Sequence, residues 1–130
     1  MKVIIAPGVC GFSLSRTSLE ELFVRRPELF GEPFPADELR LEGQSDADML
    51  DWHANAVLRD GKLHFLKYKD SRVRTDTVLV ALLDAHGDAE VRSADCGPLK
   101  LVDIPDDVNW YIHSDEDGSE SVHETHRVWQ

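Results

Sequence analysis

The stretch TDTVLVALLDAHG, residues 75–87, carries the clearest helical pattern in the chain. Thr75, Asp76 and Thr77 offer side-chain oxygens that can cap a first helical turn, and Gly87 suits the left-handed residue that often follows a helix. The segment is apolar on most of its sides, so we expect it to pack across a sheet. One long helix here, together with strands elsewhere in the chain, would indicate an α+β fold.

Strands are indicated before and after this helix. Residues 2–5 (KVII) and residues 99–105 (LKLVDIP) are rich in aliphatic side chains, and each run is brought to an end by a proline. The pair Asp60-Gly61 lies between two further β-compatible runs, which is a strong hairpin signal. We therefore expect short antiparallel strands joined by tight turns.

A second, shorter helix is expected to begin after the GFSLS segment. Ser15, Thr17 and Ser18 can each supply an N-cap oxygen, and Ser18 has a capping-box spacing with Glu21. We expect this helix to end near Pro27, because proline cannot continue it.

The middle of the chain keeps no clear period. Residues 27–45 are interrupted by prolines and glycines, which predicts a long excursion with one helical turn near 37–41. The last two strands are expected over 108–114 and 120–129. The prediction is an α+β fold in one domain, 1–130: a small antiparallel sheet with hairpins, one long covering helix and one shorter helix.

The charge of the chain narrows the choice of partner. Twenty-five acidic residues against 14 basic ones give a formal net charge of −11, which opposes binding to a phosphate backbone and makes nucleic acid an unlikely ligand. A carboxylate-rich surface suits a basic partner. Such a partner could be a DNA-binding protein whose DNA-binding surface is occupied by a protein that imitates DNA. It also suits a protein that is simply well solvated.

The location of the protein is expected to be cytoplasmic, without a membrane span. The opening apolar run is broken by Pro7 and Gly8 before it reaches the length of a signal peptide. Cys10 and Cys96 are therefore expected to be free thiols, although the sequence leaves open whether they approach each other.

The C-terminal stretch YIHSDEDGSESVHETHRVWQ, residues 111–130, first suggests a metal site. Asp117-Gly118 lies between two alternating runs, however, which predicts a hairpin and not a helix. In a strand, His123 and His126 point to opposite faces, so their HxxH spacing does not bring the two imidazoles together to bind a metal. The acidic turn also lacks the twelve-residue calcium-loop pattern. We expect no metal and no cofactor.

The register of this hairpin can be predicted from its turn and its buried face. A three-residue loop over 116–118, with Gly118 in the left-handed conformation, keeps apolar side chains opposite one another. The expected pairs are Ile112 with Val122, Trp110 with Glu124, and Val108 with His126.

Glu124 and His126 are the candidate catalytic residues. They lie two residues apart on the half-apolar face of the predicted strand, where a carboxylate can set the tautomer of an imidazole. An ion pair at the sheet margin explains the same pattern without catalysis. Arg127, Trp129 and Trp110 are the binding candidates beside this pair.

The turn before the shorter helix offers a second set of candidates. Backbone N–H groups there could meet an anion, with Ser13 and Ser15 as the binding residues. Cys10 could act as a nucleophile beside a histidine, although a tight turn and a small buried thiol explain the same residues.

Four motifs follow one another along the chain: GFSLS (11–15), LLDAHGDAE (82–90), IPDDV (104–108) and the C-terminal Glu124-x-His126-Arg127-x-Trp129 pattern. With these motifs in this order, the chain resembles a family of short uncharacterised phage and prophage proteins. The resemblance covers the first fifteen or so residues and the last fifty to sixty. It departs from the family at Cys10, where the family has glycine, and at His113 and His123. The resemblance implies a mobile-element origin but supplies no activity.

Three functions are open at this point. The favoured one is a non-enzymatic accessory protein that binds a host factor or a small ligand through the sheet face and the C-terminal strand. The second is a hydrolase with Glu124 and His126 as its acid-base pair and Arg127 steering an anionic substrate. The third is an acidic DNA mimic. The oligomeric state and the role of residues 25–72 are left open.

Overall fold

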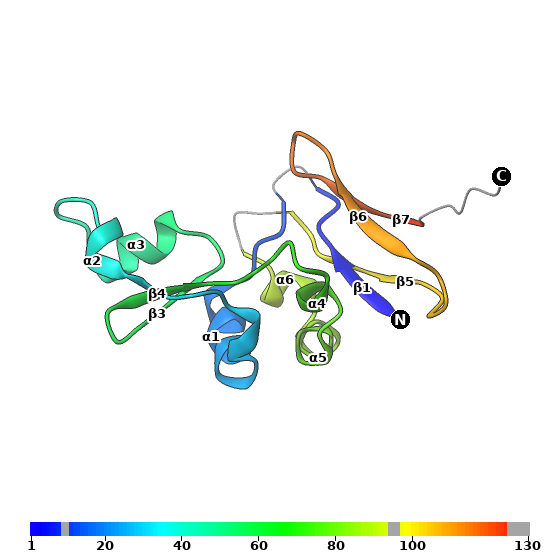
Figure 1. The fold of residues 1–130 in the computed structure, drawn as a ribbon, viewed down its shortest axis with the longest axis horizontal. Coiled ribbons are helices and arrows are strands. Elements are labelled where there is room, and N and C mark those ends of the chain that lie inside the picture. The colour runs from blue at the N-terminus through cyan, green and yellow to red at the C-terminus, as the bar shows by residue number, and fades with distance from the viewer. Residues whose placement is uncertain (9–10, 94–96, 125–130) are drawn as a thin grey trace.

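The computed structural model describes residues 1–8, 11–93 and 97–124. Its elements form a small α+β fold, as predicted (Figure 1). In chain order they are β1 (Lys2–Ile5), α1 (Arg16–Arg25), the 3₁₀ turn η1 (Pro27–Leu29), β2 (Phe34–Pro35), α2 (Ala36–Leu39), α3 (Asp46–Trp52), β3 (Ala56–Arg59), β4 (Lys62–Phe65), α4 (Ser71–Arg74), α5 (Thr77–His86), α6 (Asp88–Val91), β5 (Lys100–Asp103), β6 (Trp110–Ser114) and β7 (Glu120–Glu124).

The strands of the described residues are divided among three small antiparallel sheets and do not form one. The sheets are β1-β5, β2-β4-β3 and β6-β7. Proline explains part of this division, because Pro7 lacks the N–H that would extend the β1-β5 ladder past Ala6. The sheet β6-β7 joins the end of β1 through the Ala6 carbonyl, which accepts from the Glu120 N–H at 2.9 Å.

Helix α5 is the covering helix that the sequence predicts. The Asp76 carboxylate caps it by accepting from the N–H groups of Val78 (2.9 Å) and Leu79 (3.2 Å), and Gly87 follows it with φ 82°. Its buried face joins the main hydrophobic core, together with Ile4 of β1. The buried residues of α5 are Val78, Leu79, Leu82 and Leu83.

Helix α1 corrects two details of the sequence prediction. It is as long as α5, at ten residues each, and its N-cap is Ser15, so the predicted Ser18–Glu21 capping box is wrong. The Ser15 N–H donates to the Val91 carbonyl at 2.8 Å and its hydroxyl donates to the Glu90 carbonyl at 2.9 Å. These bonds keep Ser15 extended, so the helix begins one residue later. Its end at Arg25, before the next proline, is as predicted.

The stretch 27–45 contains more helix than predicted, because the 3₁₀ turn η1 precedes α2, which lies near the expected turn. Helix α3, which follows this stretch, was not predicted. The β3-β4 hairpin is confirmed, with a two-residue loop in which Asp60 has φ 51° and Gly61 has φ 74°. Two positive φ angles are the signature of a type I′ turn, which matches the twist of the strands.

The predicted register of the C-terminal hairpin is confirmed. Trp110 lies opposite Glu124 and Ile112 lies opposite Val122. The loop is closed by the Gly118 N–H, which donates to the Asp115 carbonyl at 2.9 Å, and Gly118 has φ 89°. The third expected pair, with His126, lies outside the described residues.

A buried ion pair attaches this hairpin to the body of the protein. The Arg74 guanidinium and the Glu120 carboxylate form two parallel bonds of 2.6 and 2.8 Å. Their side chains keep 1% and 7% of their exposure. Arg74 also donates to the carbonyls of Ile4 and Tyr68, and its guanidinium lies 3.9 Å from the centroid of the Phe12 ring. The pair therefore has the extra bonds that a buried salt bridge requires.

Asp70 begins the short helix α4 that carries Arg74. Its carboxylate accepts from the Arg72 N–H at 2.9 Å and pairs with the Arg72 guanidinium at 2.8 Å. Hydrogen bonds from the Arg72 side chain, followed by the one from its backbone, lower the pKa of Asp70 from 3.8 to about 2. Because the folded pKa is the lower one, the stabilisation is present above pH 3.8 and is lost as the pH falls toward 2.

We expect this pKa to be measurable directly. In a carboxyl ¹³C NMR titration, Asp70 should titrate near pH 2 in the wild-type protein. In Arg72→Ala its pKa should move up toward 3.8, since the bonds from the guanidinium are gone. An unperturbed Asp70 in the wild-type protein would contradict the arrangement at the start of α4.

Candidate functional site

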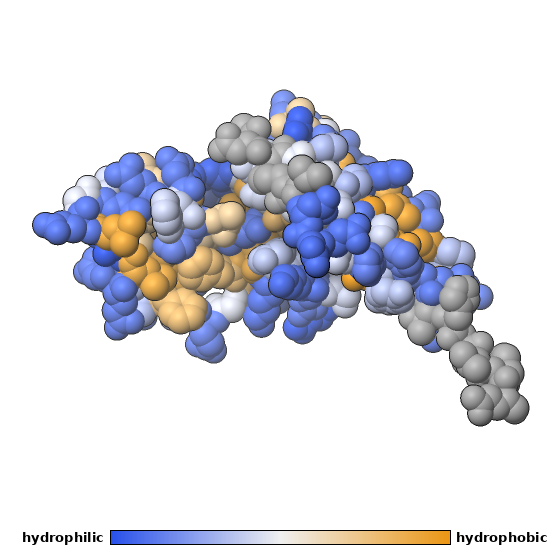
Figure 2. Space-filling model, turned by 90° about the horizontal axis from the view of Figure 1, so that it is seen from above, coloured by the Kyte–Doolittle hydropathy of each residue, from blue (hydrophilic) through white to orange (hydrophobic). Residues whose placement is uncertain are grey.

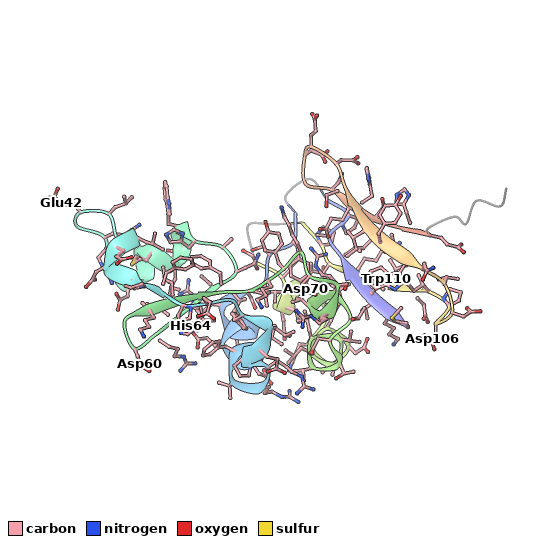
Figure 3. The ribbon with its side chains drawn as sticks, viewed as in Figure 1. Glu42, Asp60, His64, Asp70, Asp106 and Trp110 are labelled. Carbon is pink, nitrogen blue, oxygen red and sulfur yellow. The ribbon has the colours of Figure 1, made fainter. Side chains whose placement is uncertain are left out.

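The described residues 31–53, which we call the acidic lobe, carry many more acidic than basic side chains. They contain one arginine, Arg40, and no lysine. The lobe comprises β2, α2 and α3 and lies at one end of the molecule, opposite the β6-β7 hairpin (Figure 1). In Figure 3, Glu42 marks its tip and Trp110 lies toward the other end. Its seven carboxylates are all exposed: Glu32, Asp37, Glu38, Glu42, Asp46, Asp48 and Asp51.

The single arginine of the lobe is used to join α2 to α3. Arg40 pairs with Asp46 at 2.6 Å and with Asp37 at 3.4 Å, and it donates to the Gln44 carbonyl at 2.9 Å. These bonds hold α2 and α3 together, and they pair the guanidinium charge of Arg40 with carboxylates of the lobe itself. Within the part of the chain that the structure describes, Glu32, Glu38 and Glu42 make no ion pair, so their charges face solvent uncompensated.

The cap of α3 holds another negative charge in place. The Ser45 N–H donates to the Asp48 carboxylate at 3.1 Å, and the Ser45 hydroxyl accepts from the Asp48 N–H at 3.2 Å. The bond from the Ser45 backbone keeps the pKa of Asp48 below its usual value of 3.8. Asp48 is therefore ionised at neutral pH.

Large apolar side chains are exposed among these carboxylates. Trp52, the last residue of α3, is 70% exposed, and Phe34, Leu39 and Leu41 are exposed as well. Figure 2 shows apolar side chains gathered over this end of the molecule between hydrophilic ones. Exposed aromatic residues next to charged ones are a common feature of protein-binding surfaces.

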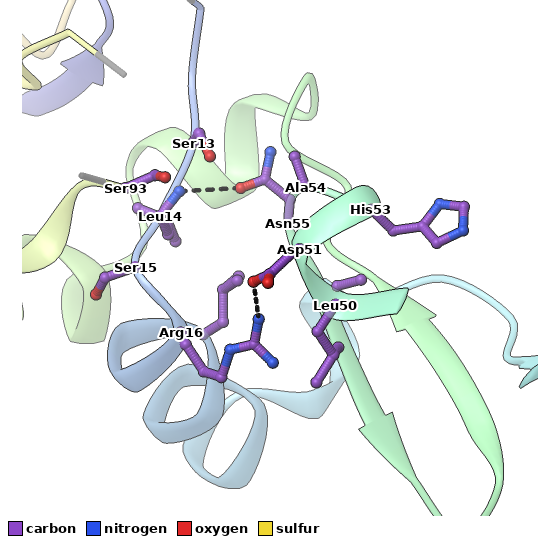
Figure 4. A pocket seen from close by; sticks show the side chains of 12 residues that line it. Ser13, Leu14, Ser15, Arg16, Leu50, Asp51, His53, Ala54, Asn55 and Ser93 are labelled. Carbon is purple, nitrogen blue, oxygen red and sulfur yellow. Dashed lines mark hydrogen bonds and ion pairs between the residues drawn. The ribbon is translucent and has the colours of Figure 1, made fainter. Parts of the chain in front are cut away.

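A pocket of about 660 Å³ lies where the acidic lobe meets the body (Figure 4). One side comes from the segment 13–16 that leads into α1, together with Ser93, and the other from residues 50–56 at the end of α3. The side chain of Asn55 joins the two sides: its Oδ1 accepts from the Leu14 N–H at 3.0 Å and its Nδ2 donates to the Phe12 carbonyl at 2.9 Å. Asn55 has φ 57°, a conformation that asparagine tolerates better than most residues.

Polar and charged groups meet in this pocket. Arg16 and Asp51 face each other across it with 3.6 Å between guanidinium nitrogen and carboxylate oxygen (Figure 4). Ser13 and Ser93 also line the pocket, and Leu19 and Leu50 contribute apolar wall. The pocket therefore combines an ion pair, hydroxyl groups and apolar surface.

The candidates predicted near the turn, Ser13 and Ser15, both line this pocket. The Ser15 hydroxyl is used as a helix cap, where it accepts from the Ser18 N–H at 3.3 Å. Ser13 keeps 7% of its exposure, and no partner of its hydroxyl is found among the described residues. Cys10 and Cys96 lie outside those residues.

The candidates predicted on the C-terminal strand are placed only in part. Glu124 is exposed at the end of β7, opposite the half-buried Trp110. His126, Arg127 and Trp129 lie outside the described residues, so the acid-base pair and the C-terminal binding strand stay predictions.

The two described histidines of the hairpin share its exposed face. The rings of His113 and His123 are 5.3 Å apart, while Asp115 lies 3.1 Å from Nε2 of His113 and Ser121 lies 2.8 Å from Nε2 of His123. No group of three metal-binding side chains comes together within residues 1–8, 11–93 and 97–124.

The comparisons with known proteins give no match. No protein-family model matches the chain, and the searches of curated proteins and of solved structures found no match to it. Across the described ranges, no helix has the length and apolar character needed to cross a membrane. The function is therefore argued from the lobe and the pocket themselves.

Proposed function

We propose that this protein is a non-enzymatic binding protein that presents its acidic lobe to a basic protein partner. The observation that carries the proposal is the exposure of seven carboxylates beside Trp52 in a segment whose only arginine is already paired. Carboxylates that lack local compensation attract a basic surface and speed its association. An exposed tryptophan supplies the apolar anchor on which binding energy is often concentrated.

The resemblance to short phage and prophage proteins supports a host protein as this partner, met in the cytoplasm. The hypothesis of DNA mimicry is one form of the proposal, in which the basic partner is a DNA-binding protein. Release of the captured partner by duplex DNA would favour that form. The hydrolase hypothesis stays a prediction about Glu124 and His126.

The proposal predicts that removal of charge from the lobe weakens partner capture, whereas removal of the same charge elsewhere does not. The lobe variant is Glu32→Gln/Glu38→Gln/Glu42→Gln, at exposed positions without ion pairs in the described structure, so folding should be unaffected. The control is Asp107→Asn/Glu116→Gln/Glu124→Gln, which removes three exposed carboxylates outside the lobe. Each tagged protein is used to capture partners from a lysate of the host, followed by affinity measurement with the purified partner.

We expect the wild-type and control proteins to retain the same basic partner. The lobe variant should bind it at least about tenfold more weakly, with a slower association rate and a smaller dependence on salt. Trp52→Ser should weaken binding by a similar factor through lost apolar contact. If the control variant loses the partner while the lobe variant retains it, the binding surface lies on the C-terminal hairpin and the proposal is wrong.

A further inference from the structure

The pocket between the acidic lobe and the body has the features of a small-molecule site. Its volume of about 660 Å³ falls within the range of roughly 300–1,000 Å³ that is usual for ligand pockets. Apolar wall from Leu19, Leu50, Ala54 and Ala56 is combined with a few polar groups. Pockets of this composition use the apolar wall for affinity and the polar groups for orientation.

Ser13 supplies a hydroxyl group to the wall of the pocket. No partner of this hydroxyl is found among the described residues, whereas the backbone groups beside it are engaged: the Ser13 carbonyl accepts from the Ser93 N–H, and the Leu14 N–H donates to the Asn55 side chain. The hydroxyl can therefore donate to, or accept from, a polar group of a ligand.

Arg16 and Asp51 define the charge of that ligand. They come from opposite walls, Arg16 from the first turn of α1 and Asp51 from the last turn of α3, and their contact of 3.6 Å is an ion pair without a hydrogen bond. A simple anion in the pocket would be attracted by Arg16 but repelled by Asp51, and a simple cation would meet the reverse. A molecule that carries both charges close together satisfies the two side chains at once.

We propose that this pocket binds a free α-amino acid or a compound with the same adjacent carboxylate and ammonium groups. The ligand carboxylate accepts hydrogen bonds from the Arg16 guanidinium, and the ligand ammonium donates to the Asp51 carboxylate. The Ser13 hydroxyl meets a polar group of the ligand, and the ligand side chain packs on Leu50 and the neighbouring alanines. Asp51 belongs to both the pocket and the acidic lobe, but the lobe variant changes only Glu32, Glu38 and Glu42, so either proposal can fail without the other.

The test is an amide NMR titration of the full chain with each of the twenty amino acids, up to about 20 mM because small ligands often bind in the millimolar range. We expect at least one of them to shift the signals of Leu14, Arg16, Asp51 and Asn55 in a saturable way. The deaminated and decarboxylated analogues of that amino acid each lack one charge and should bind at least about tenfold more weakly.

Two variants separate the site from a general effect on folding. Arg16→Ala removes the guanidinium at an exposed position and should reduce the affinity at least about tenfold, while signals far from the pocket stay unchanged. Glu116→Gln, on the distant hairpin, should leave the affinity unaltered. The proposal is overturned if no amino acid shifts the four signals in a saturable way, or if an analogue with a single charge binds as tightly as the amino acid.

Discussion

Replacing Glu120 by alanine is expected to lower the free energy of unfolding by about 3–5 kcal/mol, which is typical when one partner of a buried ion pair is removed. The change leaves the Arg74 guanidinium charged and buried, with the carbonyls of Ile4 and Tyr68 and the ring face of Phe12 as its remaining partners among the described residues. It also removes the acceptor of the Ala6 N–H, which now bonds Glu120 at 2.9 Å. Urea denaturation followed by circular dichroism measures the loss.

The same experiment has a matched control on the same hairpin. Glu116→Ala removes an exposed carboxylate from the loop and should change the free energy by no more than about 0.5 kcal/mol. Glu120→Gln keeps the size of the side chain and loses only the charge, so it serves if the alanine variant does not fold. A cost of less than about 1 kcal/mol for both changes at Glu120 would show that the ion pair does not anchor the hairpin.

The second large effect is expected at Asn55. In Asn55→Ala, the Leu14 N–H and the Phe12 carbonyl lose their partner in a buried environment, at a cost of about 1–3 kcal/mol for each group. The positive φ angle of residue 55 adds strain, because alanine adopts this conformation at a cost of about 1–2 kcal/mol.

Glycine separates these two contributions. Asn55→Gly loses both hydrogen bonds but adopts the positive φ freely, so it should be less destabilising than the alanine variant despite its smaller side chain. Thermal and urea denaturation of the two variants give the difference. If glycine at this position were as stable as asparagine, the side-chain bonds between Asn55 and the segment 12–14 would have no energetic role.

The parts of the fold that depend on local chemistry could be predicted from the sequence. The turn glycines Gly61 and Gly118 set the two hairpins, since a positive φ at these positions fixes the loop length and with it the register. Asp76 and Gly87 marked the ends of α5 for the same local reason. Helix α3 was missed although Ser45 and Asp48 have capping-box spacing, because the usual residue at the second position is Glu or Gln and the helix has only seven residues.

The long-range contacts could not be predicted in this way. Arg74 and Glu120 are 46 residues apart in the sequence, and no local signal distinguishes them from the other charged residues of the chain. The division into three sheets has the same origin, because it depends on which strand ends meet in space. A helix-capping pattern was similarly ambiguous at Ser15, where contacts with Glu90 and Val91 decided the start of α1.

The candidate sites also combine local signals, which the sequence shows, with long-range contacts, which it does not. Ser13 and Ser15 were expected to lie near a helix start, but the pocket that they line exists because residues 50–56 pack against that segment. The net charge describes the whole surface and therefore does not indicate the acidic lobe. Its signal was present in the sequence as seven acidic residues against one arginine over residues 31–53.

The central claim, that the acidic lobe binds a basic partner, is tested most directly by amide NMR of the isotope-labelled protein during titration with the partner isolated by capture. The lobe and the C-terminal hairpin lie at opposite ends of the molecule (Figure 1), so their signals report on different surfaces. We predict that signals from Phe34 to Trp52 shift or broaden while those of β6 and β7 stay unchanged. Changes confined to the hairpin, with the lobe signals unaltered, would contradict the claim.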